Sequence, residues 1–184
     1  IGPEALAEKY QQLPRDLAIK AGIPFFIEVT TETGLANVSG RGVAWGDYDN
    51  DGWQDILFNG SALWRNKGDG TFEDVTAKAK LTGLPTGQAG GYGAGVWADY
   101  NNDGFLDFFA FGDADALFKS NCDGTFTNVT AEVNPKISDG YPTLAVGWGD
   151  YDRDGFVDFY VANYERPFAV GNPDFLWKNI KGDK

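Results

Sequence analysis

One acidic segment occurs three times in the chain, and its spacing restricts the fold more than any other feature. The copies read GDYDNDGWQDI at 46–56, ADYNNDGFLDF at 98–108 and GDYDRDGFVDF at 149–159. They follow one another at steps of 52 and then 51 residues. Internal repeats near this period are typical of propellers and other arrays, in which each unit buries its apolar face against the next. The chain is therefore expected to fold as a row of similar units.

Each repeat contains short apolar segments that are separated by turns. The first segment ends in Trp, the second follows the acidic loop, the third is Leu-aromatic-basic-polar and the fourth reads F-x-x-V-T. In the first repeat these segments are 42–45, 55–59, 63–66 and 72–76, and in the second they are 95–97, 107–111, 117–120 and 126–130. The third repeat has the first three segments, at 145–148, 158–162 and 176–179. Segments of this kind joined by Asp-Gly turns predict an antiparallel meander. Repeated four-stranded meanders predict an all-β fold of β-propeller blades, here at about 40–77, 93–131 and 143–180 within a repeat domain of 25–184.

The third repeat ends before its fourth strand, whereas the segment 25–30, with FIEVT at 26–30, carries a copy of that strand near the start of the chain. Closed propellers typically have four to eight blades. Three blades are therefore expected to belong to a larger propeller, either because the chain continues beyond Lys184 or because copies associate into a six-bladed ring. The chain starts at Ile1 and has no Met, which indicates a processed or partial product.

The first 24 residues differ from the repeats and predict a short helical extension. Apolar residues recur at the spacing of one helix face, at Leu6, Tyr10, Leu13 and Leu17. Pro14 is expected to interrupt this helix.

The composition excludes several classes of protein. The 184 residues carry a formal charge of −12, which argues against nucleic acids and anionic membranes as partners. No apolar run approaches the length of a membrane-spanning helix. The chain has no His, so a Ser-His-Asp triad and most zinc sites are excluded. The single Cys122 has no second cysteine with which to form an internal disulfide.

The acidic loop follows the pattern D-x-[DN]-x-D-G-x-x-D, which suits a hard cation. Side-chain oxygens at positions 1, 3, 5 and 9, with a backbone carbonyl at position 7, can surround Ca²⁺, which takes six to eight oxygen ligands. About three structural Ca²⁺ ions per chain are therefore expected, and they would halve the formal charge. The ligands predicted are Asp47, Asp49, Asp51, Asp55 and the Trp53 carbonyl; Asp99, Asn101, Asp103, Asp107 and the Phe105 carbonyl; Asp150, Asp152, Asp154, Asp158 and the Phe156 carbonyl.

Two alternatives explain the acidic loops less well than a metal site. Ordinary Asp-Gly turns would explain one copy, but three copies in phase with the repeat favour the metal. An EF-hand requires Glu at position 12, where this chain has Phe58, Ala110 and Val161. Asn101 removes one charge from the second loop, which is therefore predicted to bind Ca²⁺ most weakly.

The pattern GVAWGDYDNDGWQDILFNG…LWRNKGDGTFEDVT, over about residues 25–180, resembles the FG-GAP/VCBS repeat. It is most similar to the ASPIC/UnbV type, which is related to cartilage acidic protein. The resemblance implies integrin-α-like propeller blades, Ca²⁺ in the first hairpin of each blade, and an extracellular, cell-surface or periplasmic location. It does not define one function, because such repeats occur in adhesion proteins, in carbohydrate-active enzymes and in subunits of larger assemblies.

Loops at the other end of the blades are expected to bind a protein partner, because long loops on a rigid scaffold often carry binding residues. They are the segments 81–93, 134–142 and 162–174. Several aromatic residues outside the repeat pattern are candidate anchors there: Tyr92, Tyr141, Tyr164, Phe168 and Phe175. The Trp residues all recur in phase with the repeat, which weakens a carbohydrate-binding interpretation without removing it.

The sequence thus predicts a calcium-binding propeller module that serves as an extracellular or periplasmic protein-binding or scaffolding element, and not an enzyme. One alternative is the scaffold of a calcium-dependent carbohydrate-active enzyme or lectin. The candidate acid and base for such an enzyme are weak, namely Glu165, Arg166 and Asp174 in one loop. Another alternative is a non-catalytic subunit of a large bacterial complex.

Overall fold

The computed structural model describes residues 26–84, 92–164 and 171–180. The expected N-terminal helix lies outside the described residues, as do Glu165, Arg166 and Phe168. The chain divides into two compact units, of which one comprises 1–38 with 66–73 and the other 39–65 with 74–184. No helix in the described ranges is long and apolar enough to cross a membrane.

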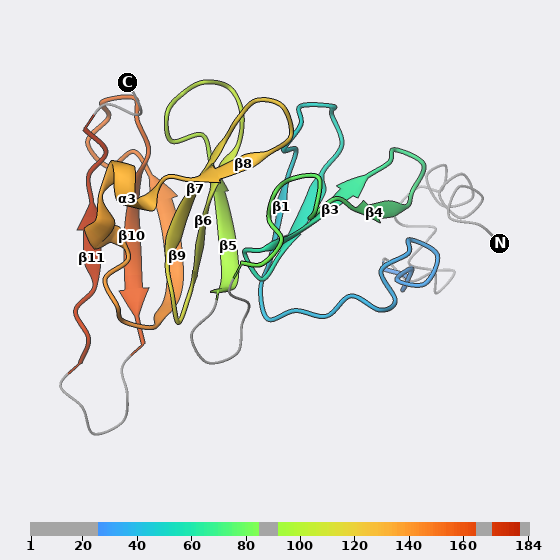
Figure 1. Ribbon diagram of the computed structural model, residues 1–184, viewed down its shortest axis with the longest axis horizontal. Coiled ribbons are helices and arrows are strands. Elements are labelled where there is room, and N and C mark those ends of the chain that lie inside the picture. Colours follow the sequence, from blue (N-terminus) through green and yellow to red (C-terminus); the bar gives the residue numbers. More distant parts are fainter. Residues whose placement is uncertain (1–25, 85–91, 165–170, 181–184) are drawn as a thin grey trace, which may run out of the picture. The chain divides into compact units, whose positions relative to one another are not determined.

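Three antiparallel sheets form the blades, each with its strands in sequence order (Figure 1). Blade 1 comprises β1 (Val43–Gly46), β2 (Asp55–Phe58), β3 (Ala62–Asn66) and β4 (Phe72–Asp74). Blade 2 comprises β5 (Tyr92–Ala98), β6 (Asp107–Gly112), β7 (Ala116–Ser120) and β8 (Phe126–Asn128). Blade 3 comprises β9 (Thr143–Gly149), β10 (Asp158–Asn163) and β11 (Phe175–Trp177). The all-β propeller-blade fold predicted from the repeat is confirmed.

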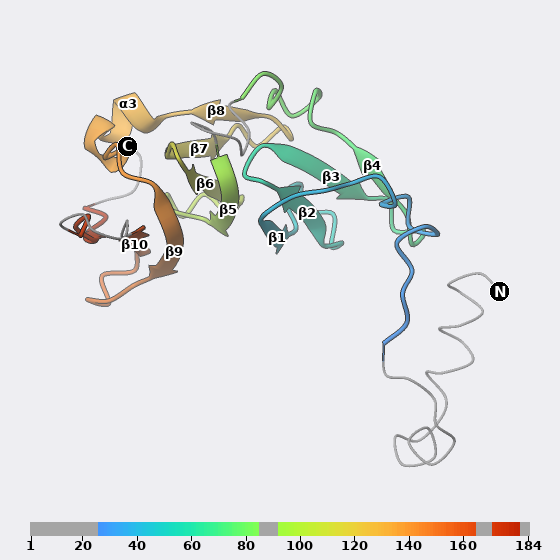
Figure 2. The ribbon, with the colours of Figure 1, turned by 90° about the horizontal axis from the view of Figure 1, so that it is seen from below.

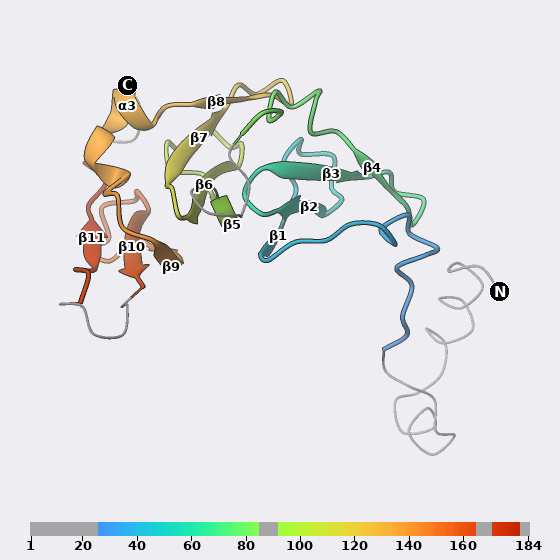
Figure 3. The ribbon, with the colours of Figure 1, turned by 60° about the horizontal axis from the view of Figure 1, so that its bottom comes forward.

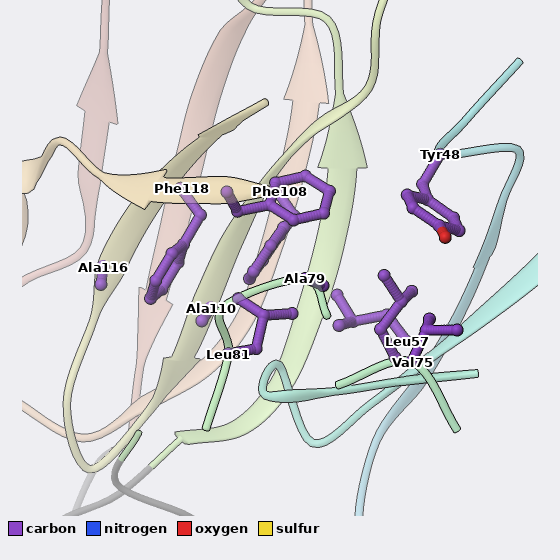
Figure 4. Packing of buried hydrophobic residues seen from close by; sticks show 11 residues of the cluster. Tyr48, Leu57, Val75, Ala79, Leu81, Phe108, Ala110, Ala116 and Phe118 are labelled. Atoms are coloured by element: carbon purple, nitrogen blue, oxygen red, sulfur yellow. The ribbon is translucent and has the colours of Figure 1, made fainter. Parts of the chain in front are cut away.

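The first apolar core lies between blades 1 and 2. Leu57 of blade 1 shares this core with Phe108 and Phe118 of blade 2 (Figure 4). Leu63 of blade 1 is buried in the same core. The rings of Phe108 and Phe118 stack with their centroids 4.7 Å apart. Close approach of the two sheets depends on Gly95 in β5, where a Cβ atom would lie 2.7 Å from Leu57 Cδ2.

The second core lies between blades 2 and 3. Successive residues of a strand point to opposite faces, so Phe109 faces away from Phe108 and packs with Phe159 of β10 at a ring distance of 5.1 Å. Leu117 and Val161 are buried in the same core. Blade 2 therefore buries apolar side chains on both of its faces.

A short helical link joins blades 2 and 3 (Figures 2 and 3). It consists of α3 (Thr130–Val133) and the 3₁₀ turn η1 (Pro135–Ile137). Ile137 is buried in the second core. The segment 134–142, expected to be only a surface loop, thus also supplies a core residue.

The described part of the other unit consists of turns within residues 26–38, together with residues 66–73, where a turn joins the end of β3 to the start of β4. The backbone N–H groups of Thr33 and Leu35 donate to the carbonyls of Val29 and Thr30, at 3.0 and 2.9 Å. Phe72 N–H donates to the Thr33 carbonyl at 3.0 Å. Residues 26–29 pair with no strand in the described part of the chain.

Candidate functional site

The acidic loops connect the first two strands of each blade. In every hairpin the last residue of the first strand lies opposite the aspartate of loop position 9 in the strand register: Gly46 opposite Asp55, Ala98 opposite Asp107 and Gly149 opposite Asp158. The aspartate at position 1 follows that strand directly. The closed hairpin thus brings the two ends of each predicted ligand set together.

Left-handed backbone at the glycine of position 6 turns each loop. The φ angles of Gly52, Gly104 and Gly155 are 90°, 86° and 91°, a region that favours glycine. The aspartate at position 1 accepts the N–H groups that this turn directs inward. Asp47 Oδ1 accepts from Asp51 N–H at 3.0 Å, and Asp47 Oδ2 accepts from Gly52 N–H at 2.9 Å.

The other two loops repeat this arrangement of bonds. Asp99 accepts at 3.0 and 2.9 Å, and Asp150 accepts at 3.2 and 3.1 Å, from the N–H groups at positions 5 and 6. In all three loops the aspartate at position 5 accepts the N–H of position 7, which is Trp53, Phe105 or Phe156. The three loops therefore share one backbone conformation, which is why the same residue types recur.

The aspartate at position 9 is buried in each blade and accepts the N–H of the tyrosine at position 2, at 3.2 to 3.3 Å. Asp107 also accepts Ser120 N–H at 2.7 Å, and Asp158 accepts Asn179 N–H at 2.8 Å. Burial raises the pKa of Asp107 to about 7, although the N–H groups of Ser120 and Tyr100 oppose this shift. A divalent cation nearby would favour the ionised form.

The predicted ligands converge in the first and third loops. Oxygen atoms of Asp47, Asp49 and Asp55 lie within 4.8 Å of one another, as do those of Asp150, Asp152 and Asp154. Asp49 Oδ1 is buried and has no hydrogen-bond partner among the residues that the structure describes. A buried carboxylate oxygen without a donor carries a desolvation cost that a bound cation would remove.

In the second loop, position 3 is an asparagine, and its side-chain amide bonds within the loop. Asn101 Nδ2 donates to Asp103 Oδ2 at 2.9 Å, and Asn101 Oδ1 accepts Asp103 N–H at 3.0 Å. These bonds bring Asn101 and Asp103 together within the loop. The Asn101 side chain still offers an oxygen, but it adds no negative charge.

Basic residues of the third strand contact two of the loops, a feature that the sequence interpretation missed. Arg65 Nε lies 2.7 Å from Asp49 Oδ2, and its guanidinium also pairs with Asp51. Lys178 pairs with Asp152 and lies 3.6 Å from Asp154 Oδ2. These bonds raise the pKa of Arg65 and Lys178 and lower the pKa of Asp152. The signal in the sequence was a basic residue at the same repeat position, 65, 119 and 178.

Hydrogen bonds also run from one loop to the next. Asn50 Nδ2 donates to the Gly104 carbonyl at 2.9 Å, and Asn102 Nδ2 donates to the Gly155 carbonyl at 2.8 Å. Both asparagines occupy position 4 with φ near 57°, at 58° and 56°, a left-handed conformation that Asn tolerates better than most residues. The sequence interpretation assigned no role to position 4.

The donor set fits a hard cation such as Ca²⁺, because it consists of carboxylate and amide oxygens with no nitrogen or sulfur ligand. The first loop holds four carboxylates against the single Arg65 charge, so it retains a negative excess. The backbone carbonyls of Trp53, Phe105 and Phe156 remain predicted ligands. The N–H groups of the same residues donate to the aspartate at position 5. Loop positions 1, 5 and 6 shape the loop. The carboxylates that cluster are at positions 1, 3 and 9 in the first loop and at positions 1, 3 and 5 in the third.

The residues suggested for an enzyme have other contacts where they are described. Asp174 Oδ1 accepts Asn163 N–H at 2.8 Å, and Asp174 Oδ2 accepts the Tyr160 hydroxyl at 3.0 Å. Phe175, a candidate loop anchor, lies in β11 with its ring 5.9 Å from that of Trp177. Both residues contribute to the structure of blade 3.

Comparison with known proteins agrees with the repeat. The FG-GAP-like repeat model matches residues 47–110 and 99–161. Cartilage acidic protein 1 of Xenopus tropicalis is 31% identical over 182 residues, which cover 92% of this chain and 26% of the relative. Cartilage acidic protein 1 of Homo sapiens is 29% identical over 171 residues, which cover 89% of this chain and 25% of the relative.

This chain spans about a quarter of the length of these curated relatives. The family model, by contrast, covers more than half of the chain and begins at the first acidic loop. Each of its two matched segments starts at one acidic loop and ends just after the next, so each contains two acidic loops and spans one full repeat. The chain belongs to the family of FG-GAP-like repeat proteins.

Proposed function

We propose that this chain is a calcium-binding propeller module that acts outside the cytoplasm as a protein-binding or scaffolding element. The observation that supports it most is the first loop, where three carboxylates converge and Asp49 Oδ1 is buried without a donor among the described residues. The third loop repeats the cluster with Asp150, Asp152 and Asp154.

The bound ion would raise the free energy of unfolding. It would bind the folded loops and leave the unfolded chain largely unbound, so it would stabilise the fold by mass action. The loops lie between the first and second strands of every blade and are bonded to one another through Asn50 and Asn102. Filling one loop would therefore also restrain its neighbour.

The same chemistry supports the proposed extracellular or periplasmic location. Extracellular calcium modules often bind at roughly 10⁻⁴ to 10⁻³ M, a range that is filled only where calcium is abundant. The formal charge of −12 also suits a module whose loops are neutralised by divalent ions. The relatives named above are cartilage acidic proteins.

Calcium titration by calorimetry, after chelation, tests the proposal. We expect about three sites per chain, and we expect Asp49→Asn to weaken one of them by at least about tenfold, since it removes a ligand charge. Asp123→Asn is the matched control, because Asp123 bonds to Thr125 in a turn outside the loops. No calcium binding, or equal binding by the two variants, would contradict the proposal.

The protein-binding surface is proposed at the strand ends away from the acidic loops. A hollow of about 490 Å³ there is lined by residues from all three of the loops expected to bind a partner: Gly93, Pro142 and Tyr164, together with Arg41, Phe111 and Leu144. Its mixture of aromatic, aliphatic and charged groups suits a protein side chain more than a sugar.

Binding to arrays of extracellular proteins and of glycans tests this surface. We expect protein ligands whose binding is lost in Tyr164→Asp and Leu144→Asp, both of which alter exposed lining residues. Leu176→Asp, on an exposed residue outside this hollow, is the control. Binding to glycans alone would favour the lectin alternative and overturn the proposal.

A further inference from the structure

The asparagine at position 4 of one acidic loop binds a peptide unit that belongs to the next loop. Asn50 Nδ2 donates to the Gly104 carbonyl at 2.9 Å. The N–H group of the same peptide unit, on Phe105, donates to Asp103 Oδ1 at 2.9 Å. Because a peptide unit is planar and rigid, its orientation links the Asn50 bond of the first loop to the Asp103 carboxylate, a predicted ligand of the second loop.

The same series of contacts joins the second loop to the third. Asn102 Nδ2 donates to the Gly155 carbonyl at 2.8 Å. The N–H group of that peptide unit, on Phe156, donates to Asp154 Oδ1 at 3.0 Å. Asp154, like Asp103, is the aspartate at position 5 and a predicted ligand. In both cases a side chain of one loop therefore helps to position a ligand of the next loop.

A second asparagine also connects the second and third loops. Asn179 follows β11, and its amide nitrogen donates to the Tyr100 carbonyl of the second loop at 2.8 Å. The same nitrogen donates to the Val157 carbonyl of the third loop at 3.3 Å. The backbone N–H group of Asn179 donates to Asp158 Oδ1, at position 9 of the third loop, at 2.8 Å. Asn179 thus bonds to both loops at once.

Blade 2 has a serine at the place that Asn179 occupies in blade 3. Ser120 N–H donates to Asp107 Oδ1 at 2.7 Å, so the backbone bond to position 9 is retained. The Ser120 hydroxyl accepts the Cys122 N–H at 3.2 Å, in the turn that follows β7. Among the described residues, one asparagine therefore bridges the first two loops, whereas two asparagines bridge the second and third.

These bridges make the conformations of neighbouring loops interdependent. The carboxylates of one loop repel one another, and this repulsion opposes the turned conformation until a cation offsets it. A loop that is already ordered holds its side of the bridge in place, so the next loop loses less conformational entropy when it binds its own cation. Such coupling acts equally in both directions. The second loop has the lowest charge and a neighbour on each side, so it gains most.

We propose that Asn50, Asn102 and Asn179 couple the acidic loops, so that a divalent cation held by one loop strengthens cation binding by the next. The proposal rests on the calcium binding proposed above and adds to it a dependence of each loop on its neighbours. A single neutral hydrogen bond supports a change of about three- to tenfold in affinity. Two bridging asparagines make the coupling between the second and third loops stronger than that between the first and second.

Calcium titration followed by amide NMR measures each loop separately. The amide groups of Gly52, Gly104 and Gly155 serve as reporters, because each binds the position 1 aspartate of its own loop. The first loop is disabled by Asp49→Asn together with Asp51→Asn, which removes two ligand charges and keeps oxygen acceptors at both positions. The calcium concentration that half-fills the second loop is then compared with and without these two substitutions.

The comparison is made in the wild-type chain and in Asn50→Gly, which keeps the left-handed backbone at φ 58° and loses the bridge. We expect disabling the first loop to weaken the second loop about three- to tenfold more in the wild-type chain than in Asn50→Gly. The loss of two charges acts alike in both backgrounds and cancels. Asn102→Gly is the matched control, because it makes the same change at position 4 of the next loop and leaves the Asn50 bridge in place.

The second and third loops test the double bridge. The third loop is disabled by Asp152→Asn together with Asp154→Asn, and the second loop is again the reporter. We expect Asn102→Gly to remove part of the coupling, and Asn102→Gly combined with Asn179→Ser to remove the rest. Serine is the residue of blade 2 at this place, and it retains the backbone N–H that binds Asp158.

Equal weakening of the second loop in the wild-type chain and in Asn50→Gly would overturn the proposal, as would full coupling in the chain that carries both Asn102→Gly and Asn179→Ser. In either case the three loops would still bind calcium, and the proposed function would stand. A chain in which none of the three glycine reporters responds to calcium would instead contradict calcium binding itself, and the coupling with it.

Discussion

Blades 2 and 3 have the same strand pattern but different surroundings. In β6 of blade 2, the neighbours Phe108 and Phe109 point to opposite faces and are both fully buried. In β10 of blade 3, Phe159 is buried against blade 2, whereas the next residue, Tyr160, is 47% exposed. The second and third strands are equivalent in the two blades, so the difference comes from what covers each face.

This difference shows where the stability of such a module lies. A blade alone cannot bury its apolar faces, so its stability depends on the interfaces with its neighbours. Blade 2 has two such interfaces within the described unit, one with each neighbouring blade. Equivalent substitutions in the two blades should therefore have unequal effects, and variants can measure that inequality.

The largest expected effect comes from truncating the central phenylalanine of each blade. We expect Phe108→Ala to lower the free energy of unfolding by about 3 to 5 kcal/mol, the usual cost of removing a buried aromatic ring. Phe159→Ala should cost about 1 to 2 kcal/mol less, because one side of its ring already borders a cavity. Urea unfolding in saturating Ca²⁺ measures both values.

If Phe108→Ala does not fold, a pair of more conservative substitutions tests the same comparison. Phe108→Leu and Phe159→Leu retain most of the side-chain volume and should show the same order with smaller values. If either pair lost more free energy of unfolding from the blade 3 substitution than from the blade 2 substitution, burial between blades would not determine the stability of this module.

A buried polar cluster joins blades 2 and 3 and gives the second prediction. Thr143 Oγ1 lies 2.7 Å from Asp115 Oδ2 and 3.1 Å from Asn163 Oδ1. The Asn163 amide nitrogen donates to Asp139 Oδ2 at 2.8 Å, so its oxygen faces Thr143. The single hydroxyl proton of Thr143 cannot serve both acceptors at once. A protonated Asp115 resolves this conflict, because it donates to Thr143 while Thr143 donates to Asn163.

The charge state of Asp115 should make stability fall as pH rises. Burial raises the pKa of Asp115 to about 7, and the nearby charge of Asp139 adds to this shift, while bonds from Thr143 and Gly112 oppose it. The folded chain holds a proton that the unfolded chain, with a pKa near 3.9, has lost. The stabilising effect is therefore complete below about pH 4, declines up to about pH 7 and is absent above that.

Asp115→Asn should remove this pH dependence. We expect the variant to be more stable than wild type at pH 8, by on the order of 3 kcal/mol, and similar to it at pH 4. Thermal unfolding at constant Ca²⁺ between these pH values measures the difference. Asp113→Asn, in the same loop but exposed, is the control and should leave the profile unchanged. A parallel profile for Asp115→Asn and wild type would refute the assignment.

The strands could be predicted from the sequence because local residues determine their ends. Asp-Gly turns and the loop glycine at position 6 set each hairpin, and the observed strands begin and end within three residues of the predicted segments. The motif F-x-x-V-T predicts a strand over its whole length, but β8 ends at Asn128, and Thr130 begins α3. The threonine is needed for its bond to Leu117, a contact across strands that spacing alone does not reveal.

The third prediction concerns the effect of the basic residues Arg65 and Lys178 on calcium binding by the loops that they contact. Arg65 occupies oxygens of Asp49 and Asp51 that Ca²⁺ would share. We expect Arg65→Gln to tighten binding in the first loop about fivefold, since one unit charge near the site is worth about 1 kcal/mol after screening. The same variant should be less stable than wild type after chelation. Lys178→Gln should act likewise on the third loop.

Calorimetric titration of each variant checks this prediction, and Lys67→Gln is the control because Lys67 pairs with Asp69 in a turn outside the loops. Weaker calcium binding by Arg65→Gln would mean that the guanidinium orders the loop instead of competing with the ion.

The acidic residues of the candidate site form a local motif that is visible in the sequence, whereas the groups that contact them from other segments could not be predicted. Asp47 to Asp55 lie within nine positions, so a short motif contains them all. Arg65 reaches Asp49 across 16 positions, and Asn50 reaches Gly104 across 54. Contacts at such separations depend on strand pairing and on the placement of neighbouring blades, which a local pattern does not determine.

The smallest expected effect concerns position 4 of the loops, where Asn50 and Arg153 share a left-handed backbone with φ of 58° and 63°. Asn50→Gly keeps this backbone but removes the bond to the Gly104 carbonyl, so we expect a loss of about 1 kcal/mol. Arg153→Gly relieves the conformational cost of a long side chain at positive φ, so we expect a gain of about 0.5 to 1 kcal/mol. Urea unfolding in saturating Ca²⁺ measures both, and opposite signs would show that the link between loops outweighs backbone strain at position 4. If both variants were more stable than wild type, the hydrogen bond of Asn50 would contribute less to stability than the left-handed backbone at this position costs.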